Sequence, residues 1–157
     1  MSIIIIPKKI SKKVDSFEEI RFEAPRLQEL IETSNFGPGY TKTSIALHHS
    51  QVHPDPFNFF VIKRSIVGAK DNEIVAFLNP QILEKDPATK TTSIEGCISF
   101  PFRPDKKVQR YDRIHVRYDV VGKDEKLEQR EEWVEGIMAR IFQHEVQHAK
   151  GCNIYQN

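Results

Sequence analysis

The chain has 157 residues, of which 39% are hydrophobic and 29% are charged, and its formal net charge is +1. This length and composition indicate one globular domain with a proper hydrophobic core, and the balanced charge gives no reason to expect nucleic acid or an anionic membrane as a partner. Two cysteines are too few for a disulfide framework, so we expect a reducing compartment.

Three segments in the N-terminal part of the chain have patterns that predict structure. Residues 3–6 are all isoleucine and precede a proline; the run is too short for a signal-peptide core or a membrane span, and we expect a buried strand or edge segment. Residues 24–35 carry apolar side chains at helical spacing and predict an amphipathic helix, which residues 36–39 end. Residues 58–64 predict a buried strand.

The rest of the chain is expected to form more strands and a second helix. Residues 73–78 predict a strand, residues 84–92 an exposed loop, and residues 110–121, with the clearest period of two, a long strand. Residues 123–126 predict a hairpin turn and residues 127–134 the returning strand. Residues 136–150 predict a helix that is apolar on more than one face, which Gly151 ends in a left-handed cap.

These elements make an α+β domain over residues 1–157. Small antiparallel or mixed sheets are expected to pack around the buried C-terminal helix, with one amphipathic helix near the N-terminus. The C-terminal helix carries the stretch HEVQH, which is the most distinctive feature of the chain.

His144 and His148 are four residues apart, so on a helix their imidazoles lie one turn apart on the same face and can bind one metal ion. Glu145 can then reach a water held by that ion without binding the ion itself. Such an H-E-x-x-H pattern suits Zn²⁺ or Fe²⁺ and indicates metal-assisted hydrolysis. The alternative is a solvated helix face on which two histidines fall one turn apart by chance.

A third protein ligand is needed for a tetrahedral catalytic site, and the candidates are few. Downstream of the motif only Cys152 remains, but on a continued helix it would lie about 12 Å along the axis from His144. The ligand should therefore come from upstream, where Cys97 is the distinctive candidate because a thiol beside a divalent cation is deprotonated and becomes a strong ligand. The alternative for Cys97 is a small buried core thiol.

Residues 95–99, EGCIS, followed by residues 143–148, QHEVQH, resemble the second and third motifs of the peptide deformylases. These enzymes hydrolyse the formyl group from the N-terminal formyl-methionine of new bacterial-type proteins. Residues 77–80, FLNP, resemble the family's asparagine-proline segment, and residues 44–52, SIALHHSQV, fall where its first motif, G-ϕ-G-ϕ-A-x-x-Q, belongs.

The resemblance implies one divalent metal ion held by Cys97, His144 and His148, with Fe²⁺ as the physiological ion and Zn²⁺, Ni²⁺ or Co²⁺ as alternatives. Glu145 would take the proton of the metal-bound water and deliver it to the departing amine. The resemblance further implies oxyanion donors, substrate-binding positions and positions that support the ligands. The donors are Gln51 and the Ile98 N–H, the substrate-binding positions are Ala46, Leu47, Gly96 and Ile98, and the supporting residues are Glu95 and Gln147.

Several of these residues have an ordinary alternative. From residue type alone, Gln51 would be interpreted as an exposed loop residue, and Glu95 would be interpreted as a member of a surface ion pair. Gln147 stands where the family usually has aspartate, so metal affinity is expected to be lower.

The first motif departs from the family pattern. Ser44 and Ala46 replace two glycines, and His48 and His49 replace small alanines, which could narrow the cleft or change which peptides enter. We expect His48 and His49 to be partly exposed polar residues, with a second metal site or substrate contact as alternatives.

The chain ends nine residues after His148 and resembles the short virus-encoded members, which lack the basic C-terminal helix that docks on the ribosome. We expect a monomer in the cytoplasm of a bacterium or of a bacterial host, acting on formyl-Met peptides or nascent chains without nucleic acid or membrane. Two other hypotheses are a metallopeptidase or other amidase on the same site, and a deformylase-like metal-binding module without turnover.

Overall fold

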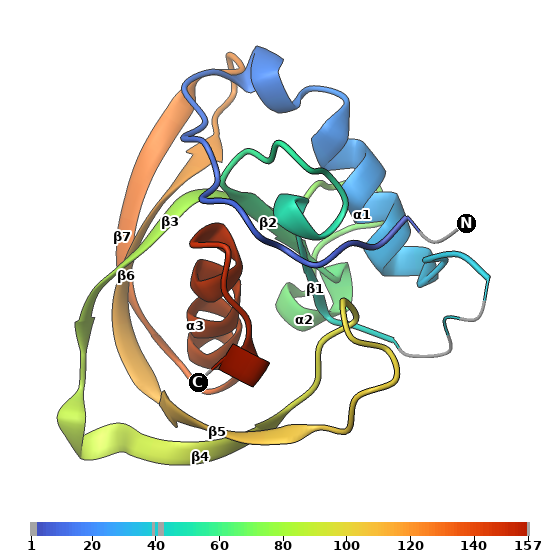
Figure 1. The fold of residues 1–157 in the computed structure, drawn as a ribbon. Coiled ribbons are helices and arrows are strands. Elements are labelled where there is room, and N and C mark those ends of the chain that lie inside the picture. The colour runs from blue at the N-terminus through green and yellow to red at the C-terminus, as the bar shows by residue number, and fades with distance from the viewer. Residues whose placement is uncertain (1–2, 39, 41–42, 157) are drawn as a thin grey trace.

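The computed structural model describes residues 3–38, 40 and 43–156, and it places helix α3 (Ile137–Ala149) between two β-sheets that curve around it (Figure 1). The larger sheet has the antiparallel order β1-β2-β3-β6-β7, and the smaller one is the antiparallel pair β4-β5. The strands are β1 (Ala46–His48), β2 (Phe59–Ile62), β3 (Ala76–Lys85), β4 (Lys90–Glu95), β5 (Lys106–Tyr111), β6 (Arg113–Val121) and β7 (Leu127–Glu135).

The remaining helices are short except for α1 (Glu23–Thr33), the amphipathic helix expected near the N-terminus. Helix α2 and four 3₁₀ turns complete the described elements; they are α2 (Arg64–Val67), η1 (Phe17–Ile20), η2 (His49–Gln51), η3 (Pro87–Thr89) and η4 (Ile154–Gln156). Within the described ranges, no helix is long and apolar enough to cross a membrane. The α+β class expected from the sequence is confirmed.

The hydrophobic core includes two large apolar clusters, and one of them fixes how α3 is rotated. One lies between α1 and the strands β1 and β2, and the other lies between the large sheet and α3. Phe142 anchors α3 in the second cluster through edge-on contacts with Phe60 and Phe77, at centroid distances of 5.3 and 5.2 Å. Because His144 and His148 lie roughly opposite Phe142 on the helix, this packing turns both histidines toward the segment that follows β4.

Two of the predicted segments differ in the structure. Residues 3–6 form no strand: Ile4 alone is buried, and the Ile5 N–H donates to the Gln51 carbonyl at 2.7 Å instead of to a strand ladder. The exposed loop predicted for residues 84–92 is wrong, since β3 continues to Lys85 and β4 begins at Lys90. These strand ends are largely solvated, so they carry no apolar alternation that would indicate a strand.

Two other strands have bounds that differ from the prediction. The strand expected over residues 110–121 is broken at Asp112, where the chain leaves β5 of the small sheet and enters β6 of the large one. The strand expected over residues 73–78 starts at Ala76 and continues past Pro80, where the β3–β6 register shifts. A proline has no N–H for the ladder, which accounts for an irregular pairing at this point.

Gly151 ends α3 in the left-handed region, with φ of +76°, as predicted, and a Cβ there would lie 2.9 Å from the Lys8 backbone. Gly151→Ala is therefore expected to lose about 1–2 kcal/mol of stability from the backbone conformation and a further ~1–3 kcal/mol from overpacking. Gly68→Ala is the matched control, because Gly68 has φ of +66° and open space around it. Urea unfolding should show a larger loss of unfolding free energy for Gly151→Ala than for Gly68→Ala. Equal losses would mean that the close contact with the Lys8 backbone does not affect stability.

Candidate metal centre

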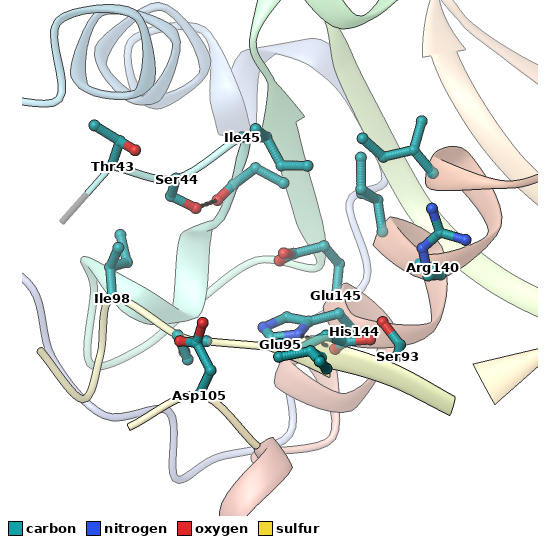
Figure 2. Close-up of a pocket in the computed structure, with 16 residues that line it drawn as sticks. Thr43, Ser44, Ile45, Ser93, Glu95, Ile98, Asp105, Arg140, His144 and Glu145 are labelled. Atoms are coloured by element: carbon teal, nitrogen blue, oxygen red, sulfur yellow. Dashed lines mark hydrogen bonds and ion pairs between the residues drawn. The ribbon is translucent and has the colours of Figure 1, made fainter. Parts of the chain in front are cut away.

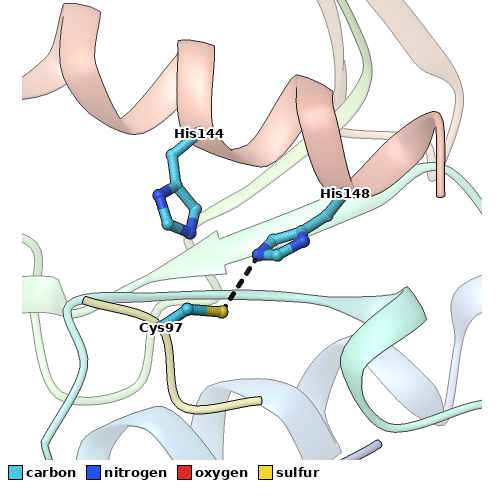
Figure 3. A group of neighbouring side chains, drawn as sticks. All are labelled: Cys97, His144 and His148. Carbon is cyan, nitrogen blue, oxygen red and sulfur yellow. Dashed lines mark hydrogen bonds between the residues drawn. The ribbon is translucent and has the colours of Figure 1, made fainter. Parts of the chain in front are cut away.

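Cys97, His144 and His148 converge, as the sequence predicts (Figure 3). Their potential ligand atoms all lie within 4.8 Å of one another, and the Cys97 sulfur is 3.5 Å from His148 Nε2. Both histidines come from consecutive turns of α3, and the cysteine lies just after β4. Among the described residues, this is the one cluster of three or more histidine, cysteine or acidic side chains with such spacing.

Hydrogen bonds fix which ring nitrogen each histidine presents to the cluster. His144 Nδ1 lies 2.8 Å from Glu95 Oε1, and His148 Nδ1 lies 3.1 Å from the carbonyl oxygen of Cys152. Both Nδ1 atoms act as donors in these pairs, so both Nε2 atoms are left to bind a cation. Cys152 thus contributes its backbone, and its exposed thiol stays outside the cluster, in agreement with the helix-geometry argument against it.

The buried surroundings shift the ionisation of both histidines. Burial lowers the pKa of His148 well below its usual range, which keeps the ring neutral as a metal ligand must be. Burial acts in the same direction on His144, but hydrogen bonding with the Cys97 sulfur and Glu95 outweighs it and raises the pKa to about 10. A cation bound at Nε2 would replace that proton, so metal binding is expected to release protons.

Glu145 lies beside the cluster and lines the same cavity as His144 (Figure 2). Its side chain is buried, and within the described part of the chain its Oε2 atom has no hydrogen-bond partner. Burial raises the pKa of this carboxyl to about 7. A buried carboxylate oxygen without a partner is costly, so its retention at this point suits a group that exchanges protons in a reaction.

Gln51 is buried, contrary to the exposed-loop alternative, and its side-chain amide is held at both ends. Its Oε1 accepts from the His48 N–H at 3.0 Å, and its Nε2 donates to Ser99 Oγ at 3.2 Å and lies 3.6 Å from the Cys97 sulfur. Ser99 in turn donates to the Ile5 carbonyl at 2.8 Å. These contacts place an amide donor beside the candidate cation ligands, and they tie the backbone of Ile5 to Gln51 and Ser99.

Arg110 is a supporting residue that the sequence analysis missed. Its guanidinium binds both oxygens of Glu95, at 2.9 and 2.8 Å, and also donates to Gln147 Oε1 at 2.8 Å. Both members of the ion pair are almost fully buried. Burial opposes the ionisation of Glu95, but hydrogen bonds with His144 and Arg110 lower its pKa to about 2. Glu95 is therefore part of a buried network and not of a surface ion pair, and Gln147 joins that network through Arg110.

His48 and His49 are buried, so the expectation that they would be partly exposed is wrong. His48 Nδ1 lies 2.9 Å from Ser50 Oγ and its Nε2 lies 3.2 Å from Asn58 Oδ1. His49 lies 3.1 Å from Glu23 Oε1 and accepts from the Phe57 N–H at 2.9 Å. Both rings are enclosed because α1 and α3 pack against β1, α3 also packs against η2, and Glu23 of α1 contacts His49. The described residues do not bring them together with a third ligand.

Burial lowers the pKa of His48 to about 3, from 6.5. Between these values the unfolded chain binds a proton that the folded chain does not, so stability is lost as the pH falls through this window. From pH 7 to pH 5, His48 should account for about 2 kcal/mol of the lost unfolding free energy. Urea unfolding of chelator-treated wild type and His48→Gln at both pH values tests this, and parallel pH profiles would contradict it.

The cavity around the cluster has a volume of about 690 Å³. Of the positions expected to contact substrate, Ala46, Gly96 and Ile98 line this cavity, as does Ser44. Leu47 does not: its side chain is fully buried in the cluster beneath α1, since neighbouring residues of a strand point to opposite faces. The cavity thus reaches the cluster past the altered first motif, and His48 and His49 are not among its lining residues.

Known proteins resemble this chain over nearly its whole length. A family model described as polypeptide deformylase matches residues 2–157. The peptide deformylase of Thermotoga maritima is 34% identical over 147 residues, covering 94% of this chain and 77% of that protein. The peptide deformylase of Thermotoga petrophila is 43% identical over 94 residues, covering 60% of this chain and 54% of that protein.

Solved structures give the same result. The crystal structure of the Thermotoga maritima peptide deformylase matches with a TM-score of 0.76 and 31% identity, covering 100% of this chain and 97% of that one. A peptide deformylase structure from Plasmodium falciparum matches with a TM-score of 0.77 and 25% identity, covering 98% of this chain and 84% of that one.

Proposed function

This chain belongs to the polypeptide deformylase family, and we propose that it hydrolyses the N-formyl group of formyl-methionyl peptides and nascent proteins through a metal-assisted reaction that releases formate. Membership makes the chain a hydrolase of N-terminal protein processing and confirms the resemblance drawn from the sequence motifs. The observation that carries the metal-assisted part of the proposal is the convergence of Cys97, His144 and His148 beside Glu145, whose Oε2 atom has no hydrogen-bond partner among the described residues.

The donor set fits a divalent cation. In a tetrahedral zinc site, sulfur and nitrogen ligands would lie about 3.6 Å apart, given bond lengths of roughly 2.3 and 2.05 Å. The 3.5 Å between the Cys97 sulfur and His148 Nε2 agrees with this value. One thiolate and two imidazoles suit borderline ions, and we propose Fe²⁺ as the physiological one, with Zn²⁺, Ni²⁺ and Co²⁺ as ions that would also bind.

A divalent cation bound by these three side chains would polarise the formyl carbonyl and lower the pKa of a water molecule. Glu145 would accept a proton from that water at its Oε2 atom and deliver it to the departing amine nitrogen, a role for which a pKa of about 7 is suitable. The amide of Gln51 and the N–H of Ile98 would donate to the oxyanion that develops on the formyl oxygen. Arg110 and Glu95 hold His144 in the orientation that this requires.

We further propose that residues 1–157 act as one domain, as a monomer, in the cytoplasm of a bacterium or a bacterial host. An extended substrate would enter between β1 and β4, both of which have an unpaired edge in the described sheets. Ala46, Gly96 and Ile98 would contact it there, and Leu47 would contribute only through its backbone.

The direct test follows formate release from a formyl-Met tripeptide by protein loaded with Fe²⁺ without oxygen, or with Ni²⁺, after metal content has been measured. We expect formate in proportion to enzyme and no cleavage of the unformylated tripeptide. Cleavage of the unformylated peptide would favour a metallopeptidase. An absence of formate from protein with one bound metal would overturn the proposal in favour of a metal-binding module without turnover.

A further inference from the structure

A second cavity lies next to the cavity at the metal centre. This second hollow of about 660 Å³ lies along β4, and Ser93, Ile94 and Arg140 line both spaces. In Figure 2, Arg140 and Ser93 lie at one end of the metal-side cavity, Ile98 and Asp105 lie toward the opposite end, and His144 and Glu145 lie between them. The two spaces therefore adjoin at Ser93, Ile94 and Arg140.

Arg140 is held in place from two directions. It lies on α3 one turn before His144, so its backbone is fixed relative to the metal ligands. Its guanidinium donates to Asp112 Oδ1 at 2.9 Å. Asp112 is itself tied between strands, because its N–H donates to the Thr89 carbonyl and its own carbonyl accepts from the Gly136 N–H. The ion pair thus spans from α3 to the junction of β5 and β6.

The surroundings of the pair differ on its two sides. On the metal side, Ile137 and Ile141 line the cavity next to Arg140 on the same helix, so at this end an apolar surface precedes the guanidinium. On the far side, the lining of the second hollow is mostly polar: it includes the hydroxyl-bearing residues Thr89, Thr91, Thr92 and Ser93 of η3 and β4, together with the charged residues Lys90 and Asp112. An apolar side chain that extended from the reacting formyl group toward this end would meet a cation after the two isoleucines.

We propose that the Arg140–Asp112 ion pair is a specificity-determining partition, which limits the length and charge of the side chain on the first residue of the substrate. This inference rests on the proposed deformylase function. An uncharged side chain of methionine's length fits the apolar end, whereas a long basic side chain is excluded by the bulk and positive charge of Arg140. Without Arg140, the two cavities would join and the Asp112 carboxylate would face the incoming side chain.

Arg140→Ala tests the partition when kcat/KM is measured for two tripeptides that differ only in their first residue, formyl-Met and formyl-Lys. Relative to wild type, the variant should raise kcat/KM for the formyl-Lys peptide by roughly tenfold or more, because the lysine ammonium can occupy the place of the guanidinium. The value for the formyl-Met peptide should change by less than about threefold, since the two isoleucines remain.

Two further variants separate charge from space. Arg140→Ala combined with Asp112→Asn should lose the gain for formyl-Lys, because the carboxylate is gone while the opening remains. Arg117→Ala is the matched control. Arg117 on β6 forms an ion pair with Glu131 on β7, this pair is about as exposed as the Arg140–Asp112 pair, and Arg117 lines neither cavity. It should leave the ratio of the two kcat/KM values as in wild type.

Metal content and thermal unfolding must first show that every variant is folded and carries metal. Each outcome then supports or contradicts one specific claim. A wild-type protein that hydrolyses formyl-Met, with an unchanged Lys-to-Met ratio in Arg140→Ala, would overturn the partition while leaving the deformylase function intact. A metal-loaded wild type inactive on formyl-Met would overturn the deformylase function itself. A gain for formyl-Lys that survives Asp112→Asn would contradict the role given to the Asp112 charge.

Discussion

Glu145→Gln is expected to lower kcat for a formyl-Met peptide by about 10²- to 10⁴-fold, the range typical for loss of a general acid–base group. The glutamine keeps the size and shape of the side chain but cannot exchange a proton near neutral pH. Because Cys97, His144 and His148 are untouched, the variant should bind the same amount of metal as wild type.

A stability measurement separates this role from a structural one. Glu145 is buried, and its Oε2 atom has no partner within the described ranges, so the carboxylate is retained at a cost to the fold. Thermal unfolding of metal-loaded Glu145→Gln should therefore occur at the wild-type temperature or above it. A variant with lost activity together with a clearly lower unfolding temperature would point to a structural role for Glu145.

The centre of the site is predictable because its geometry is largely local. A helix places His144 and His148 on one face whatever surrounds it, and the exclusion of Cys152 follows from the rise of the same helix. The convergence of Cys97 is long-range, and there the sequence succeeds because the motif as a whole resembles a known family. The apolar residues around the motif also predict correctly that the helix is buried.

The failures occur where burial is decided by distant parts of the chain. Polar composition suggests exposure for His48 and His49, but α1 and α3 close over them and each ring finds a hydrogen-bond partner. The strand ends on either side of η3 show the reverse case: they are mostly solvated and pair through their backbones, so their side chains carry no periodic signal.

The role of Arg110 beside the metal centre was not predicted, although the sequence pattern around it indicates that its side chain is buried. Val108 and Arg110 alternate along β5 and are both buried, so the arginine shares the inward face with a valine. A buried arginine needs a carboxylate partner, and Glu95 lies at the end of the neighbouring strand β4. The prediction of one strand over residues 110–121 did not separate Arg110, which lies in β5 of the small sheet, from the β6 residues of the large sheet.

Arg110→Met is accordingly expected to destabilise the protein by about 3–5 kcal/mol, the usual cost of removing one partner from a buried ion pair. Glu95 would lose both guanidinium hydrogen bonds, and Gln147 would lose its donor. Because Glu95 also fixes the ring of His144, metal affinity should fall by roughly 10- to 100-fold. Urea unfolding of the chelator-treated protein and a competition assay for Zn²⁺ measure the two effects separately.

Two milder variants keep the test informative if Arg110→Met does not fold. Arg110→Lys retains the charge but not the two parallel hydrogen bonds, so it should give a smaller loss in both measurements. Gln147→Ala removes a single neutral acceptor and should cost only about 1 kcal/mol. If Arg110→Lys lost stability but bound Zn²⁺ as tightly as wild type, the network would support the fold alone, and Glu95 would orient His144 without help from Arg110.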